Sequence, residues 1–386
     1  METAKTRSKK KFPNFYRQYS NRRRRFKSLK ALPLQGGRNS FRQAKMLHLL
    51  ISLVIFLIFS AASLPNAVNA LGVEGIIDSP YLTSKVGTNR TIKVDAGGGE
   101  DFTSVQEAIN SVPDGNSEWI IIHIRKGVYR EKIHIPERKT YIFLRGNGKG
   151  KTKIVWNTAS GDNAASATLT VSAPHFLAWG ISFKNEAQVA DGIDTPENRT
   201  VAAYVKADMV AFYHCGFFSQ HNTLFDARGR HYYENCYITG SIDFIFGKGR
   251  SIFKRCEIFV VADKRTKIMG SITAQNRGSE DDDGGFVFVK GKVYGIGNVY
   301  LGRARTAYSR VIFSETYLSK TIFPEGWTNW SFDETTEHLS LWEEECYGPG
   351  ANTTNRVPWS KQRSEDQVRH YVTIDFIDGK NWLPVY

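Results

Sequence analysis

The sequence has few cysteines, and the main part of the chain has no excess of either charge. Four cysteines in 386 residues are too few for a disulfide-built scaffold. The formal net charge of +14 comes entirely from residues 1–45, which carry 15 lysines and arginines and one acidic residue. Residues 71–386 carry the remaining 37 basic and 37 acidic residues. This balance argues against a surface that recruits polyanions, so we expect no nucleic-acid partner.

Residues 46–70 lack charged side chains altogether. Within them, Met46–Leu64 is a continuous apolar run, and Val68-Asn69-Ala70 has small residues where signal peptidase requires them. We therefore expect a basic leader over residues 1–45 and a signal peptide over 46–70 that is cleaved after Ala70. An uncleaved signal anchor remains open, because the length of this run is close to what a helix needs to span a bilayer.

Both interpretations place the chain after residue 70 outside the cell, because the basic residues stay on the cytosolic side of the membrane. Four Asn-x-Ser/Thr tripeptides lie in that part and are candidate glycosylation sites: Asn89, Asn198, Asn329 and Asn352. We expect a secreted glycoprotein.

A long helical period is also missing, and a different repeat takes its place. Three segments align without gaps around a cysteine: Phe212–Phe217, Tyr233–Ile238 and Phe253–Ile258. Each has an aromatic residue three positions before the cysteine and an apolar residue two positions after it. The segments recur at a nearly constant spacing in a region rich in β-branched and aromatic residues. This repeat predicts an all-β fold, a parallel β-helix with coils of roughly 20 residues.

The repeated cysteines, Cys215, Cys236 and Cys256, admit more than one role. One small buried thiol in each coil would form an inward column in the core. A disulfide between neighbouring coils is also allowed outside the cell, and the state of Cys346 is open as well. A metal site has little support, because no Cys-x-x-Cys pair or histidine cluster accompanies the cysteines. We expect no cofactor.

Two elements near the start of the globular part can be placed from the sequence. Thr103–Pro113 predicts a short amphipathic helix, capped by Thr103 or Ser104, that would close the N-terminal end of the coil. Trp119–Arg125 predicts a strand. The remaining expectations are a linker over 71–91, loops over 184–200 and 275–285, and a tail from Ser314 that packs along the side of the β-helix.

The spacing from each repeated cysteine predicts which residues occupy equivalent positions in neighbouring coils, and it points to candidate catalytic residues. Asn222 follows Cys215 by the same number of positions as Asp243 follows Cys236. In stacked coils they occupy equivalent positions, one strand spacing of ~4.8 Å apart. Asp243 stands among apolar residues, where a carboxylate is either solvated on the outer face or a nucleophile or base on a groove wall. Arg303 is a candidate to keep this carboxylate ionised.

Several motifs, in order, resemble the plant pectinesterase (pectin methylesterase) family. The motifs are Val94–Pro113, Gly127–Glu131, the Asp-Phe-Ile-Phe-Gly sequence in Ile242–Gly247, Leu301-Gly302-Arg303, Pro324–Trp327, Gly348–Ala351 and Arg356–Trp359. The resemblance implies a right-handed parallel β-helix, which agrees with the repeat, and a catalytic domain over residues 92–386.

The resemblance also implies a reaction, the hydrolysis of galacturonate methyl esters in pectin without a metal. In this chemistry one aspartate attacks the ester carbonyl and a second aspartate protonates the leaving methanol. A glutamine stabilises the oxyanion, and an arginine orients the nucleophile. Asp243 matches the nucleophile, and Arg303 matches the arginine.

The match to the family breaks at the acid position. His221-Asn222-Thr223-Leu224 stands where the family has Gln-Asp-Thr-Leu, so Asn222 replaces the acid and His221 replaces the oxyanion glutamine. Asparagine cannot give up a proton, although its amide can donate a hydrogen bond to an oxyanion. His221 is a candidate surrogate acid because imidazole titrates near neutral pH, but strand alternation points it away from Asn222. Asp263 is a weaker candidate.

Further departures fall on positions that the resemblance links to substrate binding. Arg199-Thr200-Val201-Ala202 stands for Gln-Ala-Val-Ala, and Thr200 is taken to replace the second glutamine. Arg305 replaces a tryptophan that stacks on sugar, and Asn163 replaces a threonine. Among the aromatic residues, Phe246 is the one we expect to line the groove.

Two functions follow from this pattern. The first is a divergent but active pectinesterase that works through an Asp243 acyl-enzyme. The alternative is a weak or inactive pectin-binding relative, because the acid/base position is Asn222. In both cases we expect the protein to bind methylated homogalacturonan and to act as a monomer in the cell wall. We expect contact with the membrane only if the leader is uncleaved. A proteinaceous pectinesterase inhibitor is a further candidate partner.

Overall fold

The computed structural model describes residues 77–386, apart from residues 89, 189–198, 263–269 and 331. The chain divides into two units, residues 1–75 and 76–386. The expected leader and signal peptide, the tripeptides at Asn89 and Asn198, and Asp263 lie outside the described residues. Within the described part, no helix is both long and apolar enough to cross a membrane.

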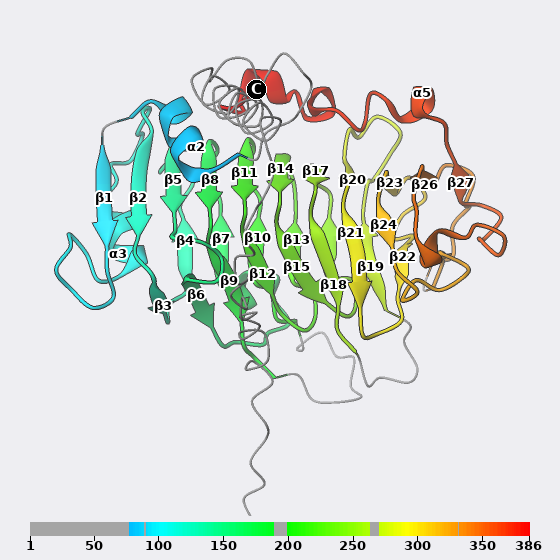
Figure 1. The fold of residues 1–386 in the computed structure, drawn as a ribbon, viewed down its shortest axis with the longest axis horizontal. Helices are drawn as coiled ribbons and strands as arrows, with labels where there is room; N and C mark the ends of the chain where they lie inside the picture. The colour runs from blue at the N-terminus through cyan, green and yellow to red at the C-terminus, as the bar shows by residue number, and fades with distance from the viewer. Residues whose placement is uncertain (1–76, 89, 189–198, 263–269, 331) are drawn as a thin grey trace, which may run out of the picture. The chain divides into compact units, whose positions relative to one another are not determined.

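Three parallel sheets wrap around one core (Figure 1). From β2 to β24 each turn of the chain adds one strand to each sheet, and sheet A has additional strands at its two ends. Sheet A holds β1 (Thr91–Val94), β2 (Ile120–Ile124), β5 (Ile142–Arg145), β8 (Phe176–Trp179), β11 (Val210–Tyr213), β14 (Arg230–Glu234), β17 (Arg250–Lys254), β20 (Gly285–Val289), β23 (Arg310–Ser314), β26 (Ser340–Glu344) and β27 (Lys361–Gln362). Sheet B holds β3 (Gly127–Tyr129), β6 (Thr152–Trp156), β9 (Ser182–Asn185), β12 (Gly216–Phe218), β15 (Tyr237–Gly240), β18 (Glu257–Val260), β21 (Lys292–Gly295) and β24 (Tyr317–Leu318). Sheet C holds β4 (Ile133–Ile135), β7 (Leu169–Val171), β10 (Ala203–Val205), β13 (Leu224–Asp226), β16 (Ile245–Gly247), β19 (Ser271–Gln275), β22 (Tyr300–Arg303) and β25 (Trp327–Thr328). The prediction of an all-β parallel β-helix is confirmed.

The even period of the repeat holds only in the middle of the β-helix. Strands β11, β14 and β17 of sheet A begin at Val210, Arg230 and Arg250, at equal intervals along the chain. The next strand of that sheet, β20, begins only at Gly285, because the connections in that coil are longer. The stacked strands keep their spacing, so extra residues leave the coil through its turns.

An aromatic ladder runs through the core beside the cysteines. Phe212, Tyr233 and Phe253, the residues three positions before each cysteine, stack with ring centroids 5.3 and 4.6 Å apart. Phe288 and Phe313 continue the ladder at 4.6 and 4.4 Å. Cys215, Cys236 and Cys256 are buried next to the ladder as free thiols, and Cys346 is also free. The core column is therefore the arrangement that the structure contains, rather than the disulfide alternative.

The turn from sheet A to sheet B uses one residue in the left-handed region at each of five coils. These residues, with φ between 46° and 54°, are His214, Asn235, Arg255, Lys290 and Glu315. Each follows directly on a strand of sheet A, so a single left-handed residue redirects the chain into the next sheet.

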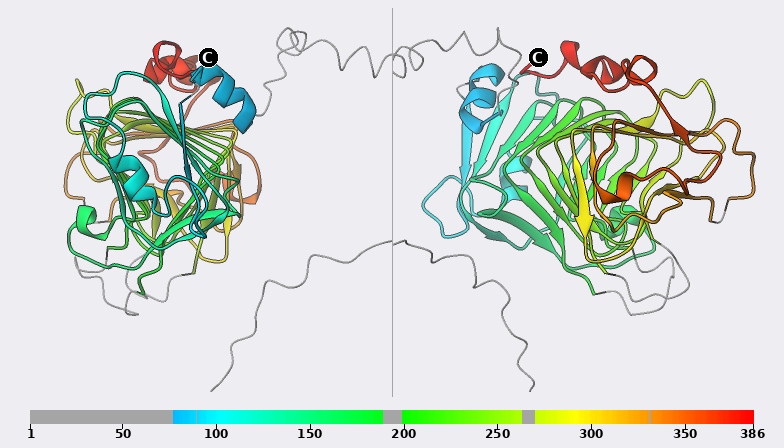
Figure 2. Two further views of the ribbon diagram at one scale, coloured as in Figure 1. Left: turned by 90° about the vertical axis from the view of Figure 1, so that its left-hand side faces the viewer. Right: turned by 45° about the vertical axis from the view of Figure 1, so that its right-hand side comes forward.

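A short helix lies across the N-terminal end of the coil, as predicted (Figure 2). This helix, α3 (Val105–Asn110), begins after Ser104, whose side chain accepts a hydrogen bond from the Glu107 amide. Its apolar face is buried in the core. The segment expected as a linker contains a second helix, α2 (Ser79–Val86), with Asp78 as N-cap and left-handed Gly87 as C-cap.

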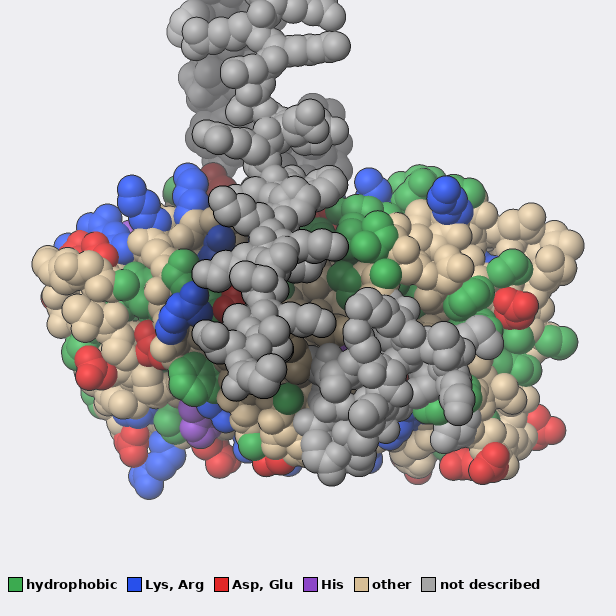
Figure 3. Space-filling view, turned by 90° about the horizontal axis from the view of Figure 1, so that it is seen from below, with side chains coloured by type: hydrophobic (Ala, Val, Ile, Leu, Met, Phe, Trp, Pro, Cys, Tyr) green, Lys and Arg blue, Asp and Glu red, His purple; other side chains and the backbone are tan. Residues whose placement is uncertain are grey.

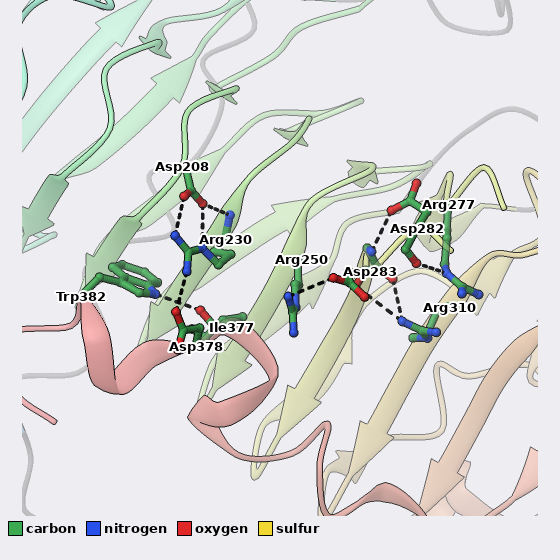
Figure 4. Close-up of polar contacts among 11 residues, drawn as sticks. Asp208, Arg230, Arg250, Arg277, Asp282, Asp283, Arg310, Ile377, Asp378 and Trp382 are labelled. Atoms are coloured by element: carbon green, nitrogen blue, oxygen red, sulfur yellow. Dashed lines mark hydrogen bonds and ion pairs between the residues drawn. The ribbon is translucent and has the colours of Figure 1, made fainter. Parts of the chain in front are cut away.

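The C-terminal segment from residue 364 packs on the outer face of sheet A (Figure 1). The tail expected from Ser314 therefore begins later than predicted, because β24 to β27 still belong to the sheets of the β-helix. The segment contains α5 (Glu365–Val368) and the 3-10 turns η4 (Ile374–Ile377) and η5 (Gly379–Asn381); the turn η3 (Pro349–Ala351) precedes it. The guanidinium of Arg230 on β14 lies 2.6 Å from the carboxylate of Asp208 and 2.8 Å from that of Asp378 in the tail (Figure 4). Charged pairs thus tie the segment to the sheet beside apolar contacts.

Candidate active site

Asn222 and Asp243 occupy equivalent positions on adjacent coils, as their equal spacing from Cys215 and Cys236 predicts. A parallel bridge joins the residues before them, His221 and Ile242, and β13 pairs with β16 immediately after them. Both residues adopt left-handed backbone conformations, with φ of 53° and 44°. Asparagine and aspartate tolerate this region better than most residues. The turn before sheet C therefore presents the two side chains one above the other.

Asp243 is held by three donor groups. Arg303 Nη2 lies 2.6 Å from Asp243 Oδ2, and Arg303 Nε lies 2.9 and 3.0 Å from the two carboxylate oxygens. Ser271 Oγ donates to Oδ1 at 2.5 Å. Arg303 is itself buried, with its guanidinium 5.0 Å from the ring centre of Trp330. This bidentate pair fixes the orientation of the carboxylate.

Two glycines let the strands around this pair approach closely. A Cβ on Gly302, next to Arg303, would lie 2.1 Å from Thr273 Oγ1. A Cβ on Gly247, at φ +127°, would lie 1.9 Å from the carbonyl oxygen of Asp226. The glycines of the two motifs therefore serve the packing of sheet C, which positions Asp243 and Arg303.

Asp243 and Asn222 face a cavity of about 260 Å³. Its lining includes five of the residues expected at the site: Asn163, Asn222, Asp243, Phe246 and Arg305. The other lining residues are Arg199, Phe225, Gly247, Ala274 and Asn276. The wall thus combines one carboxylate with amides, guanidinium groups and two aromatic rings.

The aromatic wall is an ordered stack on the outer side of sheet C. Tyr204, Phe225 and Phe246 lie on β10, β13 and β16 with ring centroids 4.7 and 4.5 Å apart and nearly parallel planes. All three are half-buried. The stack supplies a flat apolar surface of the kind on which sugar rings pack.

Two arginines, Arg199 and Arg305, meet at the cavity. Arg199 Nη1 donates to the carbonyl oxygen of Gly161 at 3.0 Å. Desolvation lowers the pKa of Arg305; the charge of Arg303 and, more weakly, that of Arg199 lower it further, whereas Asp243 raises it. The charge of Arg199 thus disfavours the charged form of Arg305, although less than burial and Arg303 do.

His221 and Thr200 are not among the residues that line the cavity. His221 is buried, and its carbonyl oxygen accepts a hydrogen bond from Thr200 Oγ1 at 3.0 Å. Thr200 is fully buried, and its hydroxyl also pairs with Ser219 Oγ at 2.6 Å. The neighbouring residue, Arg199, faces the cavity instead. It also stands at the first of the four positions, where the family motif has its glutamine.

Asn163 adds a polar group without a protein partner. It begins the short helix α4 (Asn163–Ser166), and its Oδ1 is buried with no hydrogen-bond partner in the part of the chain that the structure describes. A buried oxygen of this kind is available to a hydroxyl donor of a bound molecule.

Sequence reasoning missed Ser271, Arg199, Phe225 and Asn276. A signal existed for two of them, since Phe225 lies one repeat before Phe246 and Arg199 occupies the glutamine position. Ser271 and Asn276 follow the long connection of their coil, so the constant spacing from a repeated cysteine does not predict their positions. Asn329 and Asn352, the two described asparagines of the tripeptides, are exposed and lie outside the cavity lining.

A carboxylate bound by an arginine, together with amide side chains at a cavity on a parallel β-helix, is an arrangement suited to a carboxylic ester hydrolase of the β-helix class. The family model described as Pectinesterase matches residues 91–380. The chain belongs to the pectinesterase family, whose members hydrolyse the methyl esters of pectin.

Individual relatives agree with this assignment. "Probable pectinesterase 67" of Arabidopsis thaliana is 59% identical over 309 residues, which cover 80% of this chain and 90% of that protein. "Pectinesterase QRT1" of the same plant is 37% identical over 305 residues, or 76% and 79% of the two chains. The solved pectin methylesterase from carrot superposes with a TM-score of 0.71 at 29% identity, covering 77% of this chain and 95% of that one. These similarities favour an active esterase over an inactive pectin-binding relative.

Proposed function

We propose that this pectinesterase uses Asp243 as its nucleophile. The observation that carries the proposal is the Asp243 carboxylate, held by Arg303 and Ser271 at the wall of the cavity. A carboxylate oxygen attacks the ester carbonyl of a methylated galacturonate unit, and the C–O bond to methanol breaks. The resulting acyl-enzyme is a mixed anhydride, which water cleaves to regenerate Asp243 and release the sugar carboxylate.

The oxyanion of each tetrahedral intermediate is stabilised by Asn222. Its amide stands one coil from the nucleophile and donates a hydrogen bond without carrying a proton to transfer. Arg199 takes the place of the family glutamine in this proposal, and Thr200 only supports the backbone beside it.

Water protonates the leaving methoxide. Apart from Asp243, the residues that line the cavity are arginines, asparagines, phenylalanines, alanine and glycine, none of which is an acid near neutral pH. His221 is buried and does not line the cavity, so we assign it a structural role. The loss of general-acid catalysis is worth about 10²–10⁴-fold in rate, so we expect a slower enzyme than one with an aspartate at this position.

The sugar ring packs on Phe246 and Phe225, and the free Oδ1 of Asn163 accepts a hydroxyl hydrogen bond. The pectin substrate implies that the working enzyme acts in the cell wall, where a secreted monomer would meet it. A proteinaceous pectinesterase inhibitor that covers this groove is a further candidate partner.

The test is methanol release from highly methylated pectin by the purified full chain. Asp243→Asn is expected to lower kcat at least about 10³-fold, because the nucleophile is lost. Asp366→Asn, which changes an exposed carboxylate on α5, is the matched control and keeps the wild-type rate. A wild-type protein that folds but releases no methanol between pH 4 and 9 would contradict the proposed function.

Two further variants identify the proton source. Asn222→Asp restores an acid in register with Asp243 and is expected to raise the rate at acidic pH by up to about 10²-fold. His221→Gln is expected to change kcat less than tenfold if water is the donor. A loss from His221→Gln as large as that from Asp243→Asn, in a protein with wild-type stability, would assign the acid to His221.

A further inference from the structure

A fully buried acidic side chain lies behind the aromatic wall of the cavity, and the proposed reaction does not use it. This side chain belongs to Asp226, the last residue of β13, and is 0% exposed. The residue before it, Phe225, lines the cavity. On the face of the molecule in Figure 3, Asp and Glu side chains are interspersed with Lys and Arg at the surface. Asp226 differs from these surface acids, because it is enclosed in the β-helix and needs partners there.

Three side chains from two coils hold the carboxyl group of Asp226. On β14, His231 Nδ1 lies 3.0 Å from Oδ2, and the Tyr233 hydroxyl donates to the same oxygen at 2.7 Å. Ser251 Oγ, on β17 of the next coil, donates to Oδ1 at 2.8 Å. His231 Nε2 lies 2.7 Å from the carbonyl oxygen of Ala207, in the coil before. The network therefore spans three successive coils and fixes Asp226 between them.

The turn that follows Phe246 is packed against Asp226. The Gly249 amide donates to the carbonyl oxygen of Asp226 at 3.0 Å. A Cβ on Gly249 would lie 1.5 Å from Oδ1 of Asp226, and a Cβ on Gly247 would lie 1.9 Å from its carbonyl oxygen. Residues 247–249 thus approach Asp226 as closely as glycine allows. Because Gly247 ends β16 directly after Phe246, a shift of Asp226 would displace the Phe246 ring as well.

The same contacts therefore reach both rings of the wall. Phe225 is the chain neighbour of Asp226, and the register of β13 on β16 pairs Phe225 with Phe246. The two rings are stacked with centroids 4.5 Å apart and planes 4° from parallel. Their common plane depends on how the ends of the two strands are held, and the buried network holds both ends.

We propose that Asp226 and His231 are positioning residues for the substrate, because they hold Phe225 and Phe246 in the orientation that packs on a sugar ring. This inference rests on the proposed function, in which the sugar packs on these two rings. Asp226 and His231 do not line the cavity themselves. Their loss should therefore weaken binding of the substrate and of the transition state alike, which raises KM and leaves kcat nearly unchanged.

Steady-state kinetics of the full chain on highly methylated pectin tests this division between KM and kcat. His231→Gln is expected to raise KM about 3- to 10-fold, the size of one aromatic packing contact, with kcat within about twofold of the wild type. Ser251→Ala removes only one hydroxyl donor and should raise KM about twofold to threefold. A kcat that falls as much as KM rises, in variants with wild-type stability, would overturn the inference.

Ser314→Ala is the matched control for Ser251→Ala. Ser314 Oγ donates to the buried carboxyl group of Glu344 at 2.6 Å, and neither residue lines the cavity. Each serine variant loses one buried hydrogen bond to an acidic side chain, so both should unfold at a similarly lowered urea concentration. Only Ser251→Ala should raise KM. The same KM in both variants would mean that the network serves stability alone, against the inference.

A double variant shows whether the network acts through the wall. Phe246→Ala alone should raise KM about 3- to 10-fold. Adding His231→Gln should raise KM by no more than about a further twofold, because the ring that the network holds is already absent. If His231→Gln does not fold, Ser251→Ala takes its place in the double variant. Effects on KM that multiply would overturn the inference, whereas a KM that Phe246→Ala leaves unchanged would overturn the sugar contact in the proposed function.

Discussion

Glu343 and Asp243 are each bound by an arginine in a bidentate pair, and the two carboxylates differ in whether they face a cavity. Glu343 on β26 accepts from Arg356 Nε at 2.8 Å and from Arg356 Nη2 at 2.9 Å. Trp327 Nε1 donates to the same carboxylate at 3.2 Å, and the Glu343 side chain is 1% exposed. Asp243 and Arg303 repeat this geometry, but the Asp243 side chain is 12% exposed at the wall of the cavity.

The comparison separates a structural use of such a pair from the catalytic use that we propose for Asp243 and Arg303. Glu343 is enclosed by donors, and Arg356 also bonds the carbonyl oxygens of Pro324 and Gly350. The motifs Pro324–Trp327, Gly348–Ala351 and Arg356–Trp359 therefore meet at one buried carboxylate near the end of the β-helix. They carry the family resemblance, yet their contacts serve packing. A bidentate pair marks chemistry only where one side of the carboxylate stays open.

Among the substitutions in these pairs, the largest effect is expected on turnover. Arg303→Gln removes the group that orients Asp243, so kcat for methanol release should fall about 10²–10³-fold with a small change in KM. The measurement is steady-state kinetics on methylated pectin. An unchanged kcat, or a loss confined to KM, would show that Arg303 does not position the nucleophile.

The corresponding substitution in the enclosed pair of Glu343 and Arg356 should lower stability. Glu343→Gln leaves Arg356 without a counter-charge in the core, which costs about 3–5 kcal/mol of the free energy of unfolding. Denaturant unfolding measures this loss, and kcat per folded molecule should stay within about twofold of the wild type. The exposed neighbour Glu345→Gln is the control, with an expected change within about 0.5 kcal/mol. Loss of turnover without loss of stability would remove the distinction between the two pairs.

A third buried pair adds a pH dependence to the comparison. His231 Nδ1 lies 3.0 Å from Asp226 Oδ2, and His231 Nε2 lies 2.7 Å from the carbonyl oxygen of Ala207. Both ring nitrogens thus face acceptors. Burial lowers the pKa of His231, but the charge of Asp226 and the hydrogen bonds outweigh it and leave the pKa raised. The stabilisation is therefore complete below the unfolded pKa of about 6.5 and is lost as the pH rises through the folded pKa.

We expect the free energy of unfolding to decrease from pH 6 to pH 9, and His231→Gln to flatten this decrease. Thermal unfolding across that range measures it, with the exposed His338→Gln as the control. A slope that survives His231→Gln would assign the pH dependence to other groups.

The smallest effect is expected at the surface. Arg230→Gln breaks the link between Asp208 and the tail residue Asp378, in a pair with partly exposed side chains. Such pairs contribute about 0–1 kcal/mol, so global stability should barely change. Hydrogen exchange in residues 364–386 should rise, because the apolar contacts of the tail remain while one charged tie is gone. Unchanged exchange there would mean that the apolar contacts alone hold the segment.

The fold can be predicted from the sequence because its strongest signal is repeated and local. The cysteine and the aromatic residue three positions before it recur over three coils, and their buried stack is what the repeat indicates. The same repeat predicts that Asn222 and Asp243 are stacked, since both follow their cysteine at the same distance along the chain. The helix α2 was missed although Asp78, Pro80 and Gly87 mark its ends.

Other parts of the site depend on distances that the sequence does not encode simply. Ser271 and Arg303 reach Asp243 from one and two coils further along the chain, across connections that differ in length. Burial decides the roles of Thr200 and Arg199, which are adjacent in sequence but differ in access to the cavity. A resemblance assigns a position, whereas only packing tells which of two neighbours faces the substrate.

The aromatic ladder from Phe212 to Phe313 sets a fixed rise between coils, with ring centroids 4.4 to 5.3 Å apart. A chain that gains or loses residues in one coil cannot change this rise, so the difference must appear as a longer or shorter loop outside the core. The walls of the groove can therefore be remodelled while Asn222, Asp243 and Arg303 keep their mutual distances. The interior of this protein acts as a fixed frame that separates the evolution of specificity from that of catalysis.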